Sequence, residues 1–496
     1  AFATYVKKVQ DHDFKVMAGT DVESYQYWYQ SSEKRGLLDP NFGEPALAIG
    51  DQFVGGDRAH WATLGYFGRI NYSWKKKLLL ELNGRFDGSS NFPRNDQWAF
   101  FPSFSAGYVL SEEAFMNSVS RVLSYLKLRG SWGSVGNQDV GANSFLSVMS
   151  SSSSGWLVNG TNQLTMGTPG LVSPTLTWET VTTLDFGFDA RFLNNKLGLT
   201  FDWYKRVTSD MISAGVTLPA TLGTNPPVRN YGELTTKGWE ISIDFNHRFD
   251  NGINFNATAV LSDFTEEITK FANTSKLLSS NFEGKRLGDI WGYETDRFFT
   301  KDDFVQDANG NLVTDASGKW IMKDGVPTQK QWEASWFFYG PGDIKYRDLN
   351  GDGKIDFGAN TLDDHGDLRV IGNSTPRYQY GLRLGAEWKG VELSVFIQGV
   401  GKRNLWPNGP LVIPGYRPGE AWYQHQLDYW TEDNPNAYYP RPTDAGQSNN
   451  TRNFLPQTKY LLNLAYTRLK NLTVAYNLPL KVISKAKMQS ARIYFS

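Results

Sequence analysis

The stretch that decides the fold runs Leu184-Asp185-Phe186-Gly187-Phe188-Asp189-Ala190-Arg191-Phe192. Apolar residues occupy every second position, and Asp, Gly or Arg stands between them. Successive side chains of a β-strand point to opposite faces, so this stretch predicts a strand with one apolar and one polar face. The same alternation recurs at residues 197–203, 239–246, 253–261 and 378–388.

A weaker version of the pattern occupies residues 466–476. There Arg468 and Lys470 fall at the same alternate positions as Leu472 and Val474. An uninterrupted strand would therefore place two cations on the face that carries these apolar side chains.

The connections between these stretches alternate between short and long. Residues 75–77, 194–195, 250–252 and 389–390 carry hairpin turn chemistry, and residues 10–13 and 111–122 fall in the same phase. Long polar connections occupy residues 36–60, 135–177, 207–237, 263–376 and 401–458. Outer-membrane barrels have short periplasmic turns and longer extracellular loops. We therefore predict an all-β protein, a transmembrane antiparallel β-barrel with about 14 strands in this chain.

Strand length and aromatic placement agree with a membrane barrel. Several stretches reach the roughly 9–11 residues that a tilted strand needs to cross a bilayer. Aromatic rings, which favour the headgroup level, cluster where we expect strand ends, at Tyr27-Trp28-Tyr29, Trp74, Trp203-Tyr204 and Trp388. A soluble β-sandwich, propeller or β-helix also alternates, but the short and long connections disfavour these folds.

Composition excludes several classes of protein. The 496 residues include 50 Lys+Arg and 51 Asp+Glu, a net charge of -1 that gives no electrostatic case for nucleic acid. With no cysteine, disulfides, thiolate metal sites and cysteine nucleophiles are excluded. No apolar run reaches the roughly 18 residues of a transmembrane helix. No signal peptide opens the chain, and both ends read as strands, so we expect both ends to cut through the barrel.

The sharpest local motif runs Asp348-Leu349-Asn350-Gly351-Asp352-Gly353-Lys354-Ile355-Asp356. It follows the calcium-loop pattern D-x-[DN]-x-[DN]-G, with oxygens at alternate positions and a glycine at the sharp turn. The pattern predicts one structural Ca²⁺ held by the side chains of Asp348, Asn350, Asp352 and Asp356 and by the carbonyl of Lys354.

The motif departs from the calcium pattern at its twelfth position, which is Ala359 where a Glu is usual. Asp363, Asp364 or Asp367 could replace that ligand, and the alternative is a metal-free turn of Asp, Asn and Gly. Residues 307–311 look similar but lack further carboxylates, so we predict a turn. The serine run at 150–154 predicts a flexible loop tip.

Paired acids do not indicate an enzyme. Glu112-Glu113 and Glu266-Glu267 are adjacent in the sequence. Adjacent residues of a strand point to opposite faces, so neither pair makes a good catalytic pair of carboxylates. We therefore expect a protein without enzymatic activity.

Several blocks, in order along nearly the whole chain, resemble the SusC/RagA-like family of TonB-dependent transporters of the Bacteroidetes outer membrane. These blocks include Phe101-Pro102-Ser103-Phe104-Ser105-Ala106-Gly107, Leu126-Lys127-Leu128-Arg129-Gly130-Ser131-Trp132-Gly133-Ser134-Val135-Gly136-Asn137, Asn230-Tyr231-Gly232-Glu233, Gly342-Asp343-Ile344-Lys345-Tyr346, Trp430-Thr431-Glu432-Asp433-Asn434-Pro435-Asn436-Ala437 and Pro440-Arg441.

The resemblance implies a barrel of about 22 strands, a size whose lumen needs a plug. The family's N-terminal plug and TonB-contacting segment have no match here, so residues 1–496 are expected to be the C-terminal, larger part of a barrel. Residues 263–376, which carry the acidic loop at 348–359, and residues 401–458 are then long extracellular loops. Family members pair with a SusD-like surface lipoprotein that caps the barrel. They import an oligosaccharide, or sometimes a peptide, through TonB.

Three functions follow as alternatives: TonB-coupled import across the outer membrane, a passive porin, and a soluble glycan-binding or structural β-protein. A plug segment would distinguish a TonB-coupled importer from a passive porin. A need for detergent during extraction would distinguish either barrel from a soluble β-protein. The cargo cannot be read from the sequence. The aromatic candidates for stacking on a sugar are Trp156, Trp406, Trp422 and Tyr423. Packing within the loops, or contact with a lid protein, is the simpler interpretation of these side chains.

Overall fold

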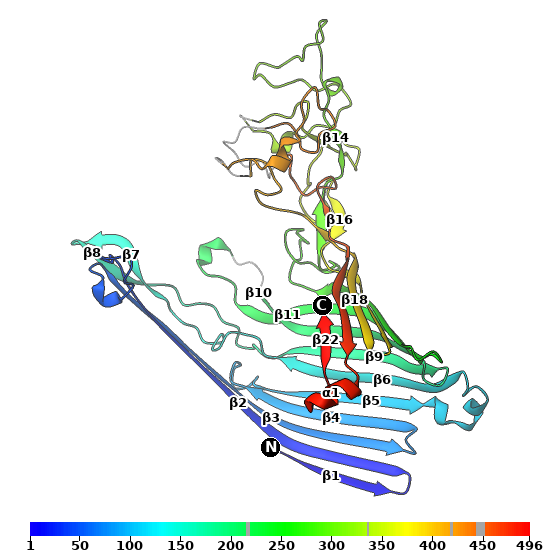
Figure 1. Ribbon diagram of the computed structural model, residues 1–496. Helices are drawn as coiled ribbons and strands as arrows, with labels where there is room; N and C mark the ends of the chain where they lie inside the picture. Colours follow the sequence, from blue (N-terminus) through cyan, green and yellow to red (C-terminus); the bar gives the residue numbers. More distant parts are fainter. Residues whose placement is uncertain (215–218, 335–336, 417–419, 443–451) are drawn as a thin grey trace. The chain divides into compact units, whose positions relative to one another are not determined.

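The computed structural model describes residues 1–214, 219–334, 337–416, 420–442 and 452–496. Fourteen strands form one antiparallel sheet, in the order β1-β2-β3-β4-β5-β6-β9-β10-β11-β12-β17-β18-β21-β22 (Figure 1). The predicted all-β class and strand number are therefore confirmed. Among the described residues, no helix is both long enough and apolar enough to cross a membrane.

The chain divides into two compact units, Ala1–Lys237 and Gly238–Ser496. The first unit contributes these strands to the sheet: β1 (Phe2–Val9), β2 (His12–Lys34), β3 (Gln52–Trp74), β4 (Leu78–Ser89), β5 (Trp98–Val109), β6 (Leu123–Asn137), β9 (Glu179–Phe192) and β10 (Leu197–Ala214). A separate hairpin pairs β7 (Ser151–Val158) with β8 (Thr161–Met166). Strand β11 (Val228–Arg248) runs from the first unit into the second.

The second unit contributes β12 (Asn254–Lys270), β17 (Arg377–Trp388), β18 (Val391–Lys402), β21 (Tyr466–Asn477) and β22 (Arg492–Phe495). Three small two-stranded sheets pair β13 (Asp289–Gly292) with β16 (Arg369–Asn373), β14 (Thr295–Phe298) with β15 (Ile344–Tyr346), and β19 (Asn404–Leu405) with β20 (Leu462–Asn463). The α-helix α1 is Leu480–Ile483. Short 3-10 helices occupy Pro45–Leu47, Leu110–Glu112, Ala114–Ser118, Ala220–Leu222, Lys301–Asp303, Lys330–Trp332, Gln424–Leu427 and Ser484–Ala486.

The short connections form the predicted hairpin turns. In the turn between β17 and β18, Lys389 and Gly390 have φ angles of 50° and 87°. A two-residue turn of type I′ needs positive φ at both central residues, and its twist matches that of the flanking strands. Glycine supports this conformation at the second position because it has no Cβ.

Several strands extend further than the alternation predicted. Residues 52–60 belong to β3, β10 continues to Ala214, β11 begins at Val228 and β12 continues to Lys270, although all were expected in loops. The serine run is not a loop tip, because Ser151–Val158 is strand β7. Alternation appears only where one face of a strand is apolar and the other polar. The backbone pairing of β2 with β3 continues to Lys34 and Gln52, beyond the region where that difference exists.

Aromatic placement was predicted only in part. Trp74 and Trp388 are the last residues of β3 and β17, as expected for rings at strand ends. Tyr27-Trp28-Tyr29 and Trp203-Tyr204 instead lie inside β2 and β10. Both strands continue past the length that a membrane requires, so their aromatic residues do not mark their ends.

A β-bulge corrects the reading of residues 466–476. Phe396 pairs with Asn471, and the next residue, Ile397, pairs with Leu469, so Lys470 is the extra residue of β21. A bulge shifts the side-chain alternation by one position. Arg468 consequently pairs with Gln398, whereas Leu472 pairs with Val395. Arg468 therefore does not share a face with Leu472, and the prediction that it lies on the apolar face is wrong.

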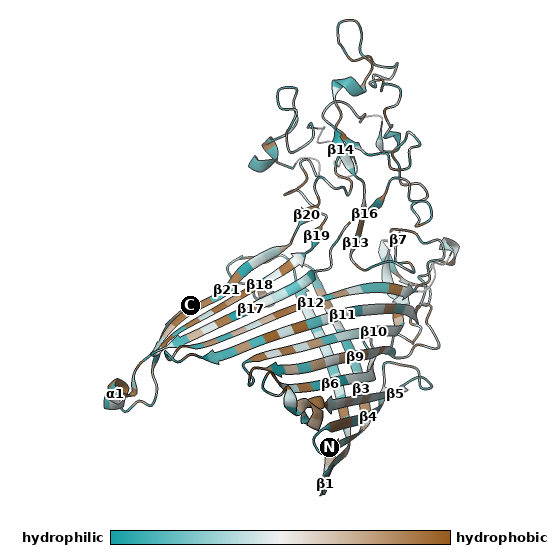
Figure 2. Cartoon of the chain, turned by 90° about the vertical axis from the view of Figure 1, so that its right-hand side faces the viewer, coloured by the Kyte–Doolittle hydropathy of each residue, from teal (hydrophilic) through white to brown (hydrophobic). Residues whose placement is uncertain are grey.

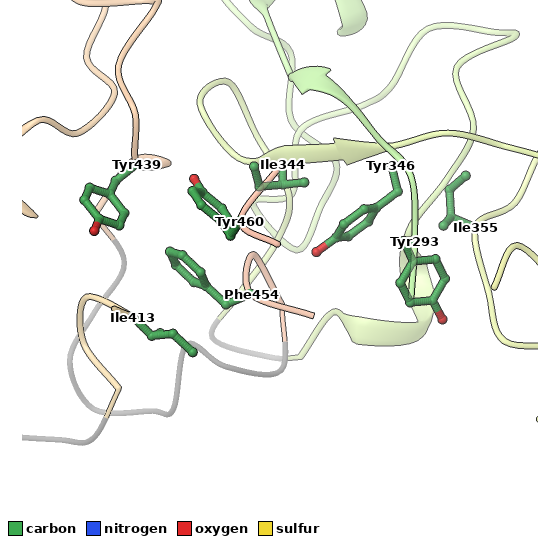
Figure 3. Close-up of a cluster of buried hydrophobic side chains, with 8 residues drawn as sticks. All are labelled: Tyr293, Ile344, Tyr346, Ile355, Ile413, Tyr439, Phe454 and Tyr460. Atoms are coloured by element: carbon green, nitrogen blue, oxygen red, sulfur yellow. The ribbon is translucent and has the colours of Figure 1, made fainter. Parts of the chain in front are cut away.

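The two long connections of the second unit share one hydrophobic core, and the first of them contains another. We call their described residues within 271–376 and 403–465 the loop body. One core comprises Tyr293, Ile344, Tyr346, Ile355, Ile413, Tyr439, Phe454 and Tyr460 (Figure 3). A second comprises Phe299, Phe304, Phe337 and Tyr339. Burial of these aromatic side chains orders a segment that has little regular secondary structure.

Candidate functional site

An exposed apolar row crosses the sheet of the first unit. Ile70 pairs with Leu82, Leu82 with Phe104, and Phe104 with Trp132. Paired residues share one face of a sheet. These side chains are 45%, 51%, 41% and 44% exposed in the same order. Soluble proteins rarely expose apolar patches larger than a few hundred Å², so this face is suited to contact with lipid.

The opposite face of the same strands carries charged side chains that pair across strands. The guanidinium of Arg129 donates to Asp202 at 2.7 Å and lies 3.3 Å from Asp189 and 3.6 Å from Asp185. Arg129 is one residue after Leu128 and three before Trp132, an odd number of positions from each. Its side chain therefore points to the face opposite the apolar row.

A second charge group lies on this polar face. Arg85 contacts Asp21 at 3.1 Å and Asp87 at 2.9 Å. Together with the group around Arg129, it gives the first unit a face with paired charges suited to water. Brown and teal residues interleave along the strands, as a wall between lipid and water requires (Figure 2).

The second unit also has a row of apolar side chains across its strands. Leu393 pairs with Ala386 on one side and with Val474 on the other. Leu393 and Val474 are among the exposed apolar side chains. Strands β17, β18 and β21 of the second unit therefore also share a face with exposed apolar residues.

The predicted calcium loop is held by hydrogen bonds within the chain. Asp348 accepts from the backbone N–H groups of Gly351 (2.6 Å) and Gly353 (2.9 Å). Both glycines have positive φ, 78° and 77°, so the sharp turn expected at Gly353 is present. The side chains of Asn350, Asp352 and Asp356 each accept from the backbone N–H two residues further on.

Asp367 joins the two ends of this motif. Its carboxylate is fully buried and accepts from the backbone N–H groups of Leu349 (2.7 Å) and Asp356 (2.9 Å). Burial raises the pKa of Asp367, and these two backbone hydrogen bonds oppose the rise. Asp364 accepts from the backbone N–H of Ala359 at 3.1 Å.

These contacts hold the loop in its conformation. The oxygen donors suit calcium chemically. However, no group of three or more His, Asp or Glu side chains is placed to hold a metal ion in the part of the chain that the structure describes. Calcium at Asp348, Asn350, Asp352, Lys354 and Asp356 therefore stays a prediction. The Asp307 motif forms the predicted turn, with Gly310 N–H donating to the Asp307 carbonyl.

The aromatic candidates do not form one platform. Trp406 packs against the first core of the loop body, and Trp422 meets Tyr429 edge to face at 5.9 Å. Tyr423 stacks on His425 at 5.9 Å. Trp156 lies on β7 and is 82% exposed. Packing within the loop body thus accounts for Trp406 and Trp422.

A buried polar network in the loop body escaped the sequence analysis. Asp343 accepts from Arg441 Nη2 (2.7 Å) and Nε (2.9 Å), from Asn453 Nδ2 (2.8 Å) and from Gly340 N–H (2.8 Å). Burial raises the pKa of Asp343, and the charge and hydrogen bonds of Arg441 oppose the rise. The network ties one long connection to the other. Asp343 and Arg441 lie in blocks that carry the family resemblance. That resemblance was the only feature of the sequence that pointed to these two residues.

Comparison with known proteins identifies the family to which this two-faced sheet belongs. A sequence model of the family described as "TonB dependent receptor-like, beta-barrel" matches residues 3–385. The chain belongs to this family of TonB-dependent receptor β-barrels. The predicted resemblance is thereby confirmed, and the family places the sheet in the outer membrane.

Relatives of this TonB-dependent receptor barrel include "TonB-dependent receptor P26" of Formosa agariphila, 27% identical over 98% of this chain and 46% of the relative. Another is "TonB-dependent receptor SusC" of Bacteroides thetaiotaomicron, 28% identical over 65% of this chain and 34% of SusC. The chain thus spans less than half the length of these two relatives.

The fold is also that of the RagAB peptide transporter. That structure superposes with a TM-score of 0.76, covering 99% of this chain and 50% of the RagAB chain at 21% identity. At this identity the likeness establishes the fold of the receptor barrel.

Proposed function

We propose that this chain forms the C-terminal, larger part of the barrel of a nutrient importer, which takes up an oligosaccharide through coupling to TonB. The observation that carries the proposal is the pairing of an exposed apolar face with a charged face in one sheet of the TonB-dependent receptor family. The apolar face meets lipid, and the charged face lines the path that water and cargo take.

The ordered loop body supports the rest of the proposal. Its buried cores make it a defined surface rather than a set of free loops. Such a surface suits docking of a SusD-like lipoprotein lid, and TonB would supply the energy for import. Peptide cargo is the second candidate, because the similar RagAB structure is that of a peptide transporter.

Cargo uptake in cells that lack the gene, with and without the restored full-length protein, tests the proposal. Import should require the full-length protein and stop when a protonophore collapses the inner-membrane proton gradient. A passive porin would continue to equilibrate the same cargo after the protonophore is added. Separate growth tests on oligosaccharides and on peptides distinguish the two cargo classes.

We also propose a structural role for calcium at the acidic loop. A Ca²⁺ ion would gather the oxygens of the predicted ligands, which now accept backbone hydrogen bonds. Binding to the ordered loop alone would stabilise that loop by mass action.

A further inference from the structure

A cavity of about 750 Å³ lies in the loop body and belongs to none of the sites described above. Its volume falls within the roughly 300–1,000 Å³ of small-molecule sites. The lining comes from the β14 edge, from the turn after Trp430 and from the segment that ends at Lys459.

Hydrogen bonds between distant segments build one wall of this cavity. Thr295 donates its backbone N–H to the Thr458 hydroxyl at 3.0 Å and its own hydroxyl to Gln457 at 2.8 Å. The backbone N–H of Lys459 donates to the Thr295 hydroxyl at 3.3 Å. These contacts fix the position of Lys459 beside β14.

Three aromatic rings surround the ammonium group of Lys459. Its Nζ lies 4.8 Å from the centroid of Phe298 and 5.7 Å from those of Tyr438 and Tyr460. Tyr460 is itself fixed in the first core of the loop body, which Figure 3 shows. The cation is therefore held at the cavity wall by cation–π contacts.

Lys459 differs from the other cations of the lining. Arg297 makes a bidentate pair with Asp303, at 2.6 and 2.7 Å, and Lys301 pairs with Glu432 at 2.8 Å. Within the described ranges, the Nζ of Lys459 has no carboxylate at ion-pair distance. Asp428 acts on Lys459 only through its charge, and its oxygens accept hydrogen bonds from Asn434 Nδ2 and Tyr438 N–H, both at 3.1 Å.

The basic side chains of the lining are Arg297, Lys301 and Lys459, and its acidic side chains are Asp296 and Glu432. Counted together with Asp303, which pairs with Arg297, the lining carries as many acidic as basic side chains, so an anion is favoured by the missing ion-pair partner of Lys459 within the described residues and not by a net positive charge. Burial lowers the pKa of Lys459 and Asp428 opposes this. A ligand carboxylate would act in the same direction as Asp428.

We propose that this cavity binds a carboxylate-bearing unit of the imported cargo, with the carboxylate on Lys459 and an apolar face of the ligand against Phe298 and Trp430. The inference rests on the proposed import function and narrows its substrate class. The carboxylate has two sources, a uronic acid within an oligosaccharide or an acidic residue within a peptide.

Calorimetry on the purified full-length transporter tests the site. One arm compares trigalacturonate with neutral galactotriose, and the other compares triglutamate with its neutral amide analogue. The unmodified protein should bind the acidic member of one pair at least 10-fold more tightly than the neutral member. The arm that shows this preference identifies the source of the carboxylate.

Four variants make the result specific. Lys459→Met should abolish the acidic preference while its side chain still fills the space between the rings, and Lys459→Arg should retain much of it. Asn436→Trp should block binding by filling the cavity. Lys330→Met is the control, since Lys330 is exposed and does not line the cavity. Equal circular-dichroism melting curves would show that the variants are folded.

Equal affinity for acidic and neutral members in both arms would overturn the inference, as would an unchanged preference in Lys459→Met. The uptake assay for the unmodified protein gives a separate answer. If uptake remains sensitive to the protonophore, import stands even when the cavity binds no carboxylate. If the acidic preference is found without such uptake, the cavity stands and the import proposal fails.

Discussion

Removal of the Asp343 carboxylate should open the loop body. The residue is fully buried, and its oxygens accept hydrogen bonds from Arg441, Asn453 and Gly340. Asp343→Ala leaves Arg441, whose side chain is only 25% exposed, without its counter-charge. Breaking a buried ion pair by removing one partner costs about 3–5 kcal/mol.

That cost converts into a measurable change in the opening equilibrium. Each 1.4 kcal/mol changes an equilibrium constant about tenfold. Amide hydrogens of the loop body should therefore exchange roughly 10²- to 4 × 10³-fold faster if they exchange through local opening. Hydrogen–deuterium exchange followed by mass spectrometry would report this in peptides that cover residues 340–346 and 452–460.

The control is Asp324→Ala, because Asp324 is an exposed side chain of the same connection. It should change protection by less than about 0.5 kcal/mol. Peptides from β3 and β4 should keep their protection in both variants, since the sheet does not depend on the loop body. If Asp343→Ala leaves peptides 340–346 as protected as Asp324→Ala does, the network does not hold the two connections together.

Three further predictions concern topology, metal and pH. A cysteine at Ser152 should react with an impermeant reagent on intact cells, and one at Asn195 should not. The opposite result would invert the topology. Asn449, a third position suited to this labelling, lies outside the described residues. Calorimetric titration of the full-length protein should detect Ca²⁺ binding with a Kd of roughly 10⁻⁴–10⁻³ M, and Asp352→Ala should abolish this binding. If neither protein releases or absorbs heat on titration with Ca²⁺, the site is refuted. Burial alone would raise the pKa of Asp303, but hydrogen bonds from Arg297, Thr300 N–H and Lys345 outweigh it and hold the pKa well below its usual value. The stabilising contribution of Asp303 should be complete above about pH 4 and lost as the pH falls toward the lowered pKa. Protection of the amide hydrogens of residues 297–304 should therefore fall with acid in the unmodified protein. An equal acid sensitivity in Asp303→Asn would contradict this.

The sheet could be predicted because each membrane strand must keep one face apolar. Phe186 and Phe188 against Asp185 and Asp189 express that requirement directly in the sequence. The same signal disappears over residues 52–60, where β3 has no consistent apolar and polar face, so the start of β3 was missed. The bulge at Lys470 was missed for another reason, since an inserted residue looks like a fault in the alternation until its partner strand is known.

The loop body could not be predicted by such a rule. Its core joins residues from two connections, and Asp343 and Arg441 are 98 positions apart. No periodicity links such residues, because they do not lie on one regular element. The acidic motif was predicted as a calcium loop with a sharp turn at Gly353, and the turn is present, whereas the calcium stays a prediction. The additional contacts of Asp367 depend on the fold of the whole connection.

The central claim is that alternate residues of these strands face lipid and water. Spin labels placed singly along β9 and β10 in outer-membrane preparations test it through their accessibility to oxygen and to a water-soluble nickel chelate. Gly187 should be avoided, because a Cβ there would clash with the side chain of Asp202. Labels at Phe186, Phe188 and Phe201 should be exposed to oxygen and shielded from nickel, with the reverse at Asp185, Asp189 and Thr200. Equal nickel accessibility at both sets would contradict the membrane wall.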